Sequence, residues 1–293
     1  MKSAVANRIL LTTNNHLGDS VALTAALHDA KKAFPDFQFD YDGNYGDVFR
    51  GNPDVTRFDR REPHDEIRVT YAGSQRTGDG GNLCEAASRS LSMQLGALTG
   101  IFYKKRHSTP YLHLTKNEKT HDFHIGKPYC VLNTNSQNRS EVKAYPHYQR
   151  MIDILLEKGI TPVLVGGDRG RDITEELHGC VDLRLKTTQR ELFSLVYQCE
   201  LVISPSSGVI HIGAAFGKRM ICIVGARKSP VITRYPKCTR LTSKCRRGFD
   251  ECHACMRFYL HGDHKACEDV VEINGKPYAR CMSDVSPEIH DFL

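Results

Sequence analysis

Residues 129–225 alternate between short apolar runs and helix-like segments, which leaves few folds open to this chain. The apolar runs are YCVLN, TPVLVGG, LVIS and MICIVG. Between them the apolar residues recur with helical spacing in YPHYQRMIDILLEKG, RDITEELHG, QRELFSLVYQC and SSGVIHIGAAFG. In the first of these helices we expect Pro146 in the first turn and Gly159 just past the end. Strands and helices that alternate at this spacing predict a parallel sheet with right-handed crossovers.

The first half of the chain shows a weaker form of the same pattern. Its expected elements are a strand at 9–11, a helix over about 20–34, a strand in FQFDYD and a helix in EAASRSLSMQLGAL. The polar segment 116–128 ends in Gly and Pro and is typical of a linker. We therefore predict an N-terminal domain over 1–115, a linker over 116–128, a C-terminal domain over 129–244 and a cysteine-rich tail over 245–293.

Composition excludes several classes of protein. At 293 residues, with 40% hydrophobic and 25% charged residues, the chain has the size and balance of a two-domain globular protein. The N-terminus lacks the features of a signal peptide, and no run approaches the roughly 20 apolar residues of a membrane helix. Eleven cysteines, several within apolar runs, favour a reducing compartment. We expect a cytoplasmic protein.

Charge is unevenly distributed along the second half. The net charge is only +6, yet every charged residue from Lys218 to Arg247 is a Lys or an Arg. Such a segment is either a solvated face or the surroundings of an anionic ligand or acceptor, and we favour the second interpretation.

The stretch SPSSGVIHIGAAFG, residues 204–217, predicts an anion site. If Ser206 or Ser207 caps the helix, the amides of Gly208, Val209 and Ile210 have no partner within it. Together with the helix dipole they favour a phosphate, which Gly208 would allow close to the backbone. His211, one turn into the helix, could reach a diphosphate or a ribose. The alternative is a capped helix whose histidine is satisfied by a neighbour.

Other polar groups follow the remaining predicted strands of this half. They are Asn133 to Ser136, Gly166 to Asp168 and Gly225. Because ligands of parallel sheets bind beyond the carboxyl ends of the strands, these groups predict one shared site.

The stretch at 204–217 resembles the D-[ST]-G-x-x-H-[LI]-A-A-A signature of the heptosyltransferase-like glycosyltransferases, glycosyltransferase family 9. Three further stretches resemble the family in the same order: RILLTTNNHLGDSVALTAALHDAKKAFPDFQFDY, NTNSQNRSEVKAYPHYQRMI and CHACMRFYLHGDHKAC with ARCMSDVSPE. In this chain Ser206 replaces the acidic residue of the signature. The segment from about 55 to 125 carries no part of the resemblance.

The resemblance implies an α/β protein of GT-B type, in which two Rossmann-like domains with parallel sheets face each other across a cleft. It implies an inverting glycosyltransferase whose nucleotide-sugar donor lies mainly on the second domain and needs no catalytic metal. Asp19, after Gly18 in HLGDS, is the candidate base; the alternative is an acid that merely stabilises the start of a helix. Lys143 is the candidate partner of the diphosphate. Further candidate donor contacts are Gly18, Thr134, Ser136, Gly167, Asp168, Ser206, Ser207, Gly208, Val209 and His211.

The tail carries Cys252, Cys255, Cys267 and Cys281, a spacing that opens with C-x2-C. Four thiolates in this pattern are typical of a tetrahedral structural site for zinc or iron. Cys245, His253, His261 or His264 could replace one ligand, and unrelated reduced thiols are the alternative. The segment is similar to the iron-holding cysteine finger of autotransporter heptosyltransferases.

Three functions remain open from the sequence. The first is sugar transfer to a glycan or protein by an enzyme that could form a homo-oligomer. The second is sugar transfer to hydroxymethylated bases of DNA, which the basic segment favours. The third is a metal-stapled nucleic-acid-binding protein without catalysis.

Overall fold

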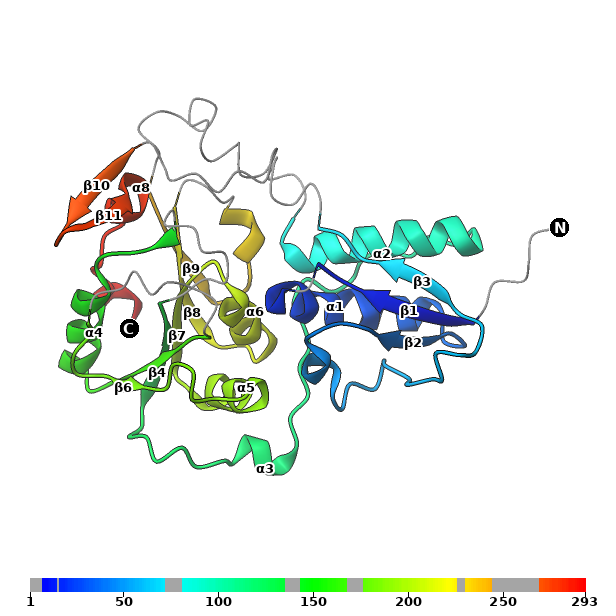
Figure 1. Ribbon diagram of the computed structural model, residues 1–293, viewed down its shortest axis with the longest axis horizontal. Helices are drawn as coiled ribbons and strands as arrows, with labels where there is room; N and C mark the ends of the chain where they lie inside the picture. Colours follow the sequence, from blue (N-terminus) through cyan, green and yellow to red (C-terminus); the bar gives the residue numbers. More distant parts are fainter. Residues whose placement is uncertain are drawn as a thin grey trace.

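The computed structural model describes residues 7–14, 16–71, 81–134, 143–167, 176–225, 230–243 and 269–293. Two lobes lie side by side, with the N-terminal elements in one and the later elements in the other (Figure 1). Among the described helices none is both long and apolar enough to cross a bilayer.

The first lobe is built on a three-stranded parallel sheet of order β2-β1-β3. Its strands are β1 (Arg8–Thr12), β2 (Gln38–Tyr41) and β3 (Asp65–Arg68). Helices α1 (Leu17–Ala33) and α2 (Leu83–Thr99) pack against each other, and the short helix η1 (Gly46–Phe49) follows β2. The predicted strands and helices of this half are confirmed. β3 was not predicted, because DEIR has only one buried position and no apolar alternation.

The second lobe contains a six-stranded parallel sheet of order β6-β5-β4-β7-β8-β9. Its strands are β4 (Tyr129–Asn133), β5 (Thr161–Val165), β6 (Val181–Asp182), β7 (Leu201–Pro205), β8 (Arg219–Val224) and β9 (Cys238–Thr242). β4 and β7 are buried at every position, as expected of central parallel strands covered on both faces. The predicted parallel sheet is confirmed.

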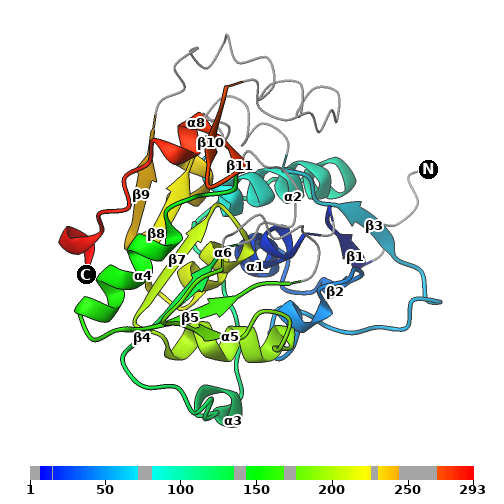
Figure 2. The same ribbon diagram turned by 60° about the vertical axis from the view of Figure 1, so that its left-hand side comes forward.

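Helices cover both faces of this sheet. On one face lies α4 (Tyr148–Glu157), and on the face toward the first lobe lie α5 (Gln189–Gln198) and α6 (Gly208–Ala215) (Figure 2). Alternate strand residues serve the two faces, so Val131 joins the core shared with the first lobe while Leu132 packs with α4. α4 begins at Tyr148, so Pro146 precedes the helix and does not lie in its first turn as predicted. The predicted helix RDITEELHG falls mostly outside the described residues.

The segment between the lobes is anchored by one arginine. It includes α3 (Lys116–Lys119), whose Glu118 carboxylate accepts hydrogen bonds from the Arg190 guanidinium of α5 at 2.6 and 2.7 Å. Arg190 also donates to the carbonyl oxygens of Asp47 and His113. The Arg190 contact is the main cause that lowers the pKa of Glu118 to about 2. A single buried cation thus ties the linker and the first lobe to the second.

The end of the chain returns to the second lobe. Strands β10 (Val270–Ile273) and β11 (Lys276–Ala279) form a hairpin whose two turn residues, Asn274 and Gly275, both have positive φ. Helix α8 (Arg280–Ser283) and the short helix η4 (His290–Phe292) follow, and η3 (Pro230–Thr233) precedes β9. The chain after β11 packs beside α4, where the Tyr145 hydroxyl donates to the Val285 carbonyl.

Candidate active site at the junction of the lobes

Helix α6 begins with a serine cap that is anchored to the neighbouring strands. The Ser207 hydroxyl accepts a hydrogen bond from the Val209 amide at 3.3 Å. It also contacts the Ser204 hydroxyl at 2.7 Å and accepts from the Asn133 amide group at 2.9 Å. Ser204 is the next-to-last residue of β7 and Asn133 the last of β4, so the start of α6 is fixed at the carboxyl ends of two strands. The predicted cap is confirmed, and Ser207 rather than Ser206 supplies it.

The start of α1 faces the start of α6 across the lobe boundary (Figure 1). A Cβ atom at Gly18 would lie 2.8 Å from Cδ2 and 3.3 Å from Nε2 of His211. A Cβ atom at Gly208 would lie 3.1 Å from Cγ of Leu17. Glycine at both positions therefore allows the two helices to touch. We expected Gly208 to make room for a phosphate, but on its Cβ side it makes room for Leu17.

Asp19 lies in the first turn of α1 and is buried, with 9% of its surface exposed. Its backbone carbonyl accepts a 2.6 Å hydrogen bond from the hydroxyl of Tyr71. Burial, and then the charge of Asp19, raise the pKa of Tyr71 well above its usual value, so the phenol remains protonated. The N-cap residue His16 makes no side-chain cap. The structure thus places a carboxylate one residue from the glycine that contacts His211.

His211 is buried between the lobes, with 4% of its surface exposed. Its Nδ1 lies 2.7 Å from the hydroxyl of Tyr235, and the two rings meet edge to face. The opposite edge of the imidazole, Cδ2 and Nε2, faces Gly18.

Lys143 lies on the strand side of the same helix start. Its Nζ is 3.5 Å from the Ser206 carbonyl oxygen, which it approaches as a donor. Thr134, directly after β4, is 4% exposed and Gly167 follows β5, both at the same edge of the sheet. Ser136 and Asp168 lie outside the described residues. The structure therefore brings Gly18, Asp19, Lys143 and residues 206–211 to one junction.

Residues 88–266, more than half of the chain, match the family described as Glycosyltransferase family 9 (heptosyltransferase). The chain belongs to glycosyltransferase family 9. Two curated members are similar over shorter stretches. Lipooligosaccharide heptosyltransferase 2 of Haemophilus influenzae is 29% identical over 94 residues, which are 28% of this chain and 27% of that protein. The Haemophilus ducreyi protein of the same name is 31% identical over 87 residues, 26% and 25% of the two chains. The match thus spans about a quarter of these relatives.

Solved family 9 structures share the fold over most of the chain. The ADP-heptose LPS heptosyltransferase II of E. coli aligns with a TM-score of 0.65 at 14% identity, over 96% of this chain and 95% of that one. A glycosyl transferase family 9 protein from Veillonella parvula gives 0.64 at 16% identity, over 81% and 86%. The dodecameric iron-containing heptosyltransferase TibC in complex with ADP-D-beta-D-heptose gives 0.66 at 15% identity, over 96% and 74%. The predicted GT-B architecture is confirmed.

Tyr235 and Tyr71 contact His211 and the Asp19 carbonyl at this junction and were missed from the sequence. Tyr235 lies in the basic segment, where charge alone suggested a role for that part of the chain. Tyr71 follows β3 and precedes residues outside the described part. Both hydroxyls reach the site only because the elements that carry them pack at the lobe junction. No local spacing in the sequence signals that packing.

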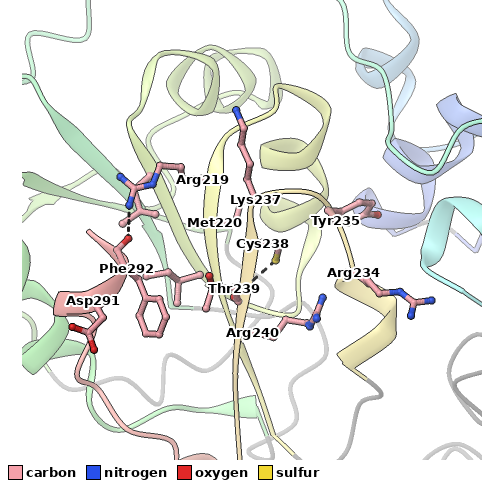
Figure 3. Close-up of a pocket in the computed structure, with 12 residues that line it drawn as sticks. Arg219, Met220, Arg234, Tyr235, Lys237, Cys238, Thr239, Arg240, Asp291 and Phe292 are labelled. Carbon is pink, nitrogen blue, oxygen red and sulfur yellow. Dashed lines mark hydrogen bonds between the residues drawn. The ribbon is translucent and has the colours of Figure 1, made fainter.

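The basic segment lines a different feature of the second lobe. A hollow of about 570 Å³ lies along the first halves of β8 and β9, lined by Arg219, Arg234, Lys237 and Arg240 with Asp291 (Figure 3). Within the described residues no carboxylate forms an ion pair with any of these four cations. Because β8 and β9 are parallel to β7, this hollow is at the amino ends of the strands. It shares Tyr235 with the junction, because this residue lines the hollow and its hydroxyl contacts His211.

Of the four predicted metal ligands, only Cys281 lies in the described part of the chain. It is 8% exposed and packs beside Met282 near Gly225, in the core beside α4. The β10–β11 hairpin brings Arg280 onto Asp269, two residues after Cys267, through a backbone bond of 2.9 Å and an ion pair of 2.8 Å. Cys252, Cys255 and Cys267 lie outside the described residues. Within the described ranges no three His, Cys, Asp or Glu side chains are grouped to hold a metal.

Proposed function

We propose that this chain transfers a sugar from a nucleoside-diphosphate sugar to an acceptor hydroxyl. One observation carries the proposal: the turn that bears Gly18 and Asp19 lies against His211 at the capped start of α6. Asp19 of one lobe is thereby one residue from the contact with His211, at a helix start where the other lobe supplies amides and Lys143. Sugar transfer needs both halves, a base for the acceptor and stabilisation for the leaving diphosphate.

The roles follow from the positions of the groups. The Asp19 carboxylate accepts the proton of the acceptor hydroxyl as that oxygen bonds to the anomeric carbon. The bond from this carbon to the phosphate oxygen breaks, and its electron pair leaves with the nucleoside diphosphate. Lys143, the first amides of α6 and His211 stabilise the charge on the diphosphate. Attack on the side opposite the leaving group inverts the anomeric configuration.

We assign the remaining predicted contacts to the same donor. Thr134 and Ser136 follow β4 and would donate hydrogen bonds to the phosphates, while Gly167 and Asp168 follow β5 and would face the ribose or base. Similar proteins named for ADP-heptose support an ADP-linked heptose as the first donor to test. A hexose on another nucleotide is the alternative donor.

A thermal-shift screen across ADP-, UDP-, GDP- and CDP-sugars tests the donor directly. A donor that binds only the folded state should raise the melting temperature as its concentration increases. At a concentration about one hundred times Kd, the free energy of unfolding should increase by about 2.7 kcal/mol. NMR of the product should show inverted configuration at the anomeric carbon. If no nucleotide sugar raises the melting temperature or is hydrolysed, the proposal fails and a non-catalytic binding protein becomes the better hypothesis.

For the acceptor we propose a glycan or a protein hydroxyl. Four described cations of the basic segment, Arg219, Arg234, Lys237 and Arg240, line the hollow at the amino ends of β8 and β9 and not the start of α6. These four cations therefore give no direct support for a DNA acceptor, while Arg227, Lys228, Lys244, Arg246 and Arg247 lie outside the described residues. The proposed acceptor is tested against duplex DNA with hydroxymethylated bases. Sugar transfer to this DNA, with a protein–DNA affinity that falls steeply as salt increases, would overturn it.

We propose further that the tail holds a structural zinc or iron through Cys252, Cys255, Cys267 and Cys281. The hairpin that brings Arg280 to Asp269 supports this, because it holds the residue next to Cys281 against a residue two positions after Cys267 in the chain. An iron-containing family 9 neighbour also supports it. Elemental analysis of the purified protein should give one metal per chain, lost in Cys255→Ser but kept in the control Cys180→Ser. Substoichiometric metal unchanged by Cys255→Ser would end the proposal.

A further inference from the structure

We propose that Tyr235 is a positioning residue that holds neutral His211 with its hydrogen on Nε2, the edge that faces the start of α1. This inference deepens the proposed function and rests on it for its catalytic consequence. The tautomer itself can be measured without any substrate.

The first step is the geometry around the imidazole. The Tyr235 hydroxyl contacts Nδ1 at 2.7 Å, while the Nε2 edge lies against Gly18, next to Asp19. The two nitrogens therefore have different surroundings, one inside the second lobe and one at the junction. In a neutral imidazole only one nitrogen carries hydrogen, and the partner of the other nitrogen decides which.

The second step follows the hydrogens. Burial raises the pKa of the Cys84 thiol to about 12 and that of Tyr235 well above its usual value, so both are protonated at neutral pH. The Cys84 sulfur lies 3.7 Å from the Tyr235 hydroxyl oxygen. If the thiol donates to that oxygen, the single phenol hydrogen is directed to Nδ1 of His211. Nδ1 is then an acceptor, and the ring hydrogen lies on Nε2.

The third step is the chemical consequence. An Nε2–H presents a hydrogen-bond donor on the edge of the ring that faces the start of α1, whereas a bare Nε2 lone pair presents an acceptor there. Tyr235 therefore turns a buried histidine into a donor without protonating it. The hydroxyl itself remains buried, with the residue 5% exposed, and acts through His211.

The fourth step is the origin of the contact. Cys84 belongs to α2 of the first lobe, and Tyr235 to the second. Beside them the Asn82 side-chain amide donates to the Arg234 carbonyl at 3.0 Å and to the Ser108 carbonyl at 2.7 Å. The orientation of His211 thus depends on how the two lobes dock.

The test is ¹⁵N NMR of the histidine side chains in the full chain, with the His211 signal assigned by its loss in His211→Gln. We expect the Nε2–H tautomer in the wild type and a shift toward Nδ1–H in Tyr235→Phe. The matched control is Tyr129→Phe, which removes a similarly buried hydroxyl bonded to the Leu195 carbonyl. An Nδ1–H tautomer in the wild type, or an unchanged tautomer in Tyr235→Phe, overturns the proposal.

Kinetics separates this proposal from the proposed function. With the donor found by the screen, Tyr235→Phe should lower kcat about tenfold to a hundredfold with little change in KM. Cys84→Ala should move the tautomer in the same direction, and Cys84→Ser, which keeps a donor, should restore it. If Tyr235→Phe does not fold, the two Cys84 variants decide. If the wild type shows the expected tautomer but no transferase activity, only the proposed function is wrong. If the wild type is active but Tyr235→Phe leaves the His211 tautomer unchanged, only the positioning role of Tyr235 is wrong.

Discussion

The starts of α1 and α6 are built from the same unit, a parallel strand followed by a helix, yet they differ in their caps. α6 has a serine cap bound to two strand ends, and its first turn carries no acid. α1 has no side-chain cap, and its first turn carries Asp19. A helix start without acids suits a bound anion, whereas one with a carboxylate suits a base. The difference between the lobes thus lies in a few residues at equivalent turns.

Replacing the acid of α1 should have the largest effect. Asp19→Asn removes the candidate base and should lower kcat on the order of a hundredfold to ten-thousandfold, because positioned bases contribute about that much. Donor binding, measured by thermal shift, should persist. The matched control is Asp36→Asn, an exposed acid just past the same helix. Turnover retained in Asp19→Asn would remove this residue from the mechanism.

Replacing Arg190, which joins the two lobes, should have the next largest effect, on the free energy of unfolding. Arg190→Ala removes the charged donor of the Glu118 carboxylate and of two carbonyls and should destabilise the protein by about 3 kcal/mol. The control is Arg184→Ala, which removes an ion pair within one lobe and should lower the free energy of unfolding by less than about 1 kcal/mol. Both values are measured by denaturant titration. Equal losses in the two variants would contradict a special role for the interlobe contact.

The same contact predicts a pH dependence. The pKa of Glu118 is lowered to about 2, so the contact contributes fully above the ordinary value near 4.5. Stability should fall by on the order of 2 kcal/mol as pH decreases from about 4.5 to about 2, because the carboxylate is protonated. Glu118→Gln should show a smaller decrease over this range. An identical pH profile in the variant would exclude Glu118 as the cause.

Removing the serine cap of α6 should have the smallest effect on stability. Ser207→Ala deletes the acceptor of the Val209 amide and should cost about 1 kcal/mol. Because the cap also fixes the helix start, donor affinity should fall several-fold while kcat changes less. Thr188→Ala, which removes the cap of α5, is the control: it should destabilise similarly and leave donor affinity unchanged. Equal donor affinity in the two variants would contradict an anion site at α6.

The sequence was sufficient wherever a local pattern determines structure. The four inner strands of the second lobe, β4, β5, β7 and β8, follow from apolar runs, whereas the edge strands β6 and β9 were not predicted. The cap of α6 follows from serines before a glycine. It was insufficient where the lobes meet. The reason for glycine at 208 is Leu17 of the other lobe, and the partner of His211 is Tyr235, which is 24 residues away along the chain. Such contacts depend on how whole layers dock, and no residue spacing encodes them.

The buried cluster that contains Val131 of the second lobe also contains Ile9, Leu23 and Leu91 of the first. Apolar surface shared in this way makes the two halves one cooperative folding unit, since separating them would expose it to water. Cleaving the chain within 116–128 should therefore give a nicked protein whose fragments stay associated and melt together, not two halves that survive apart.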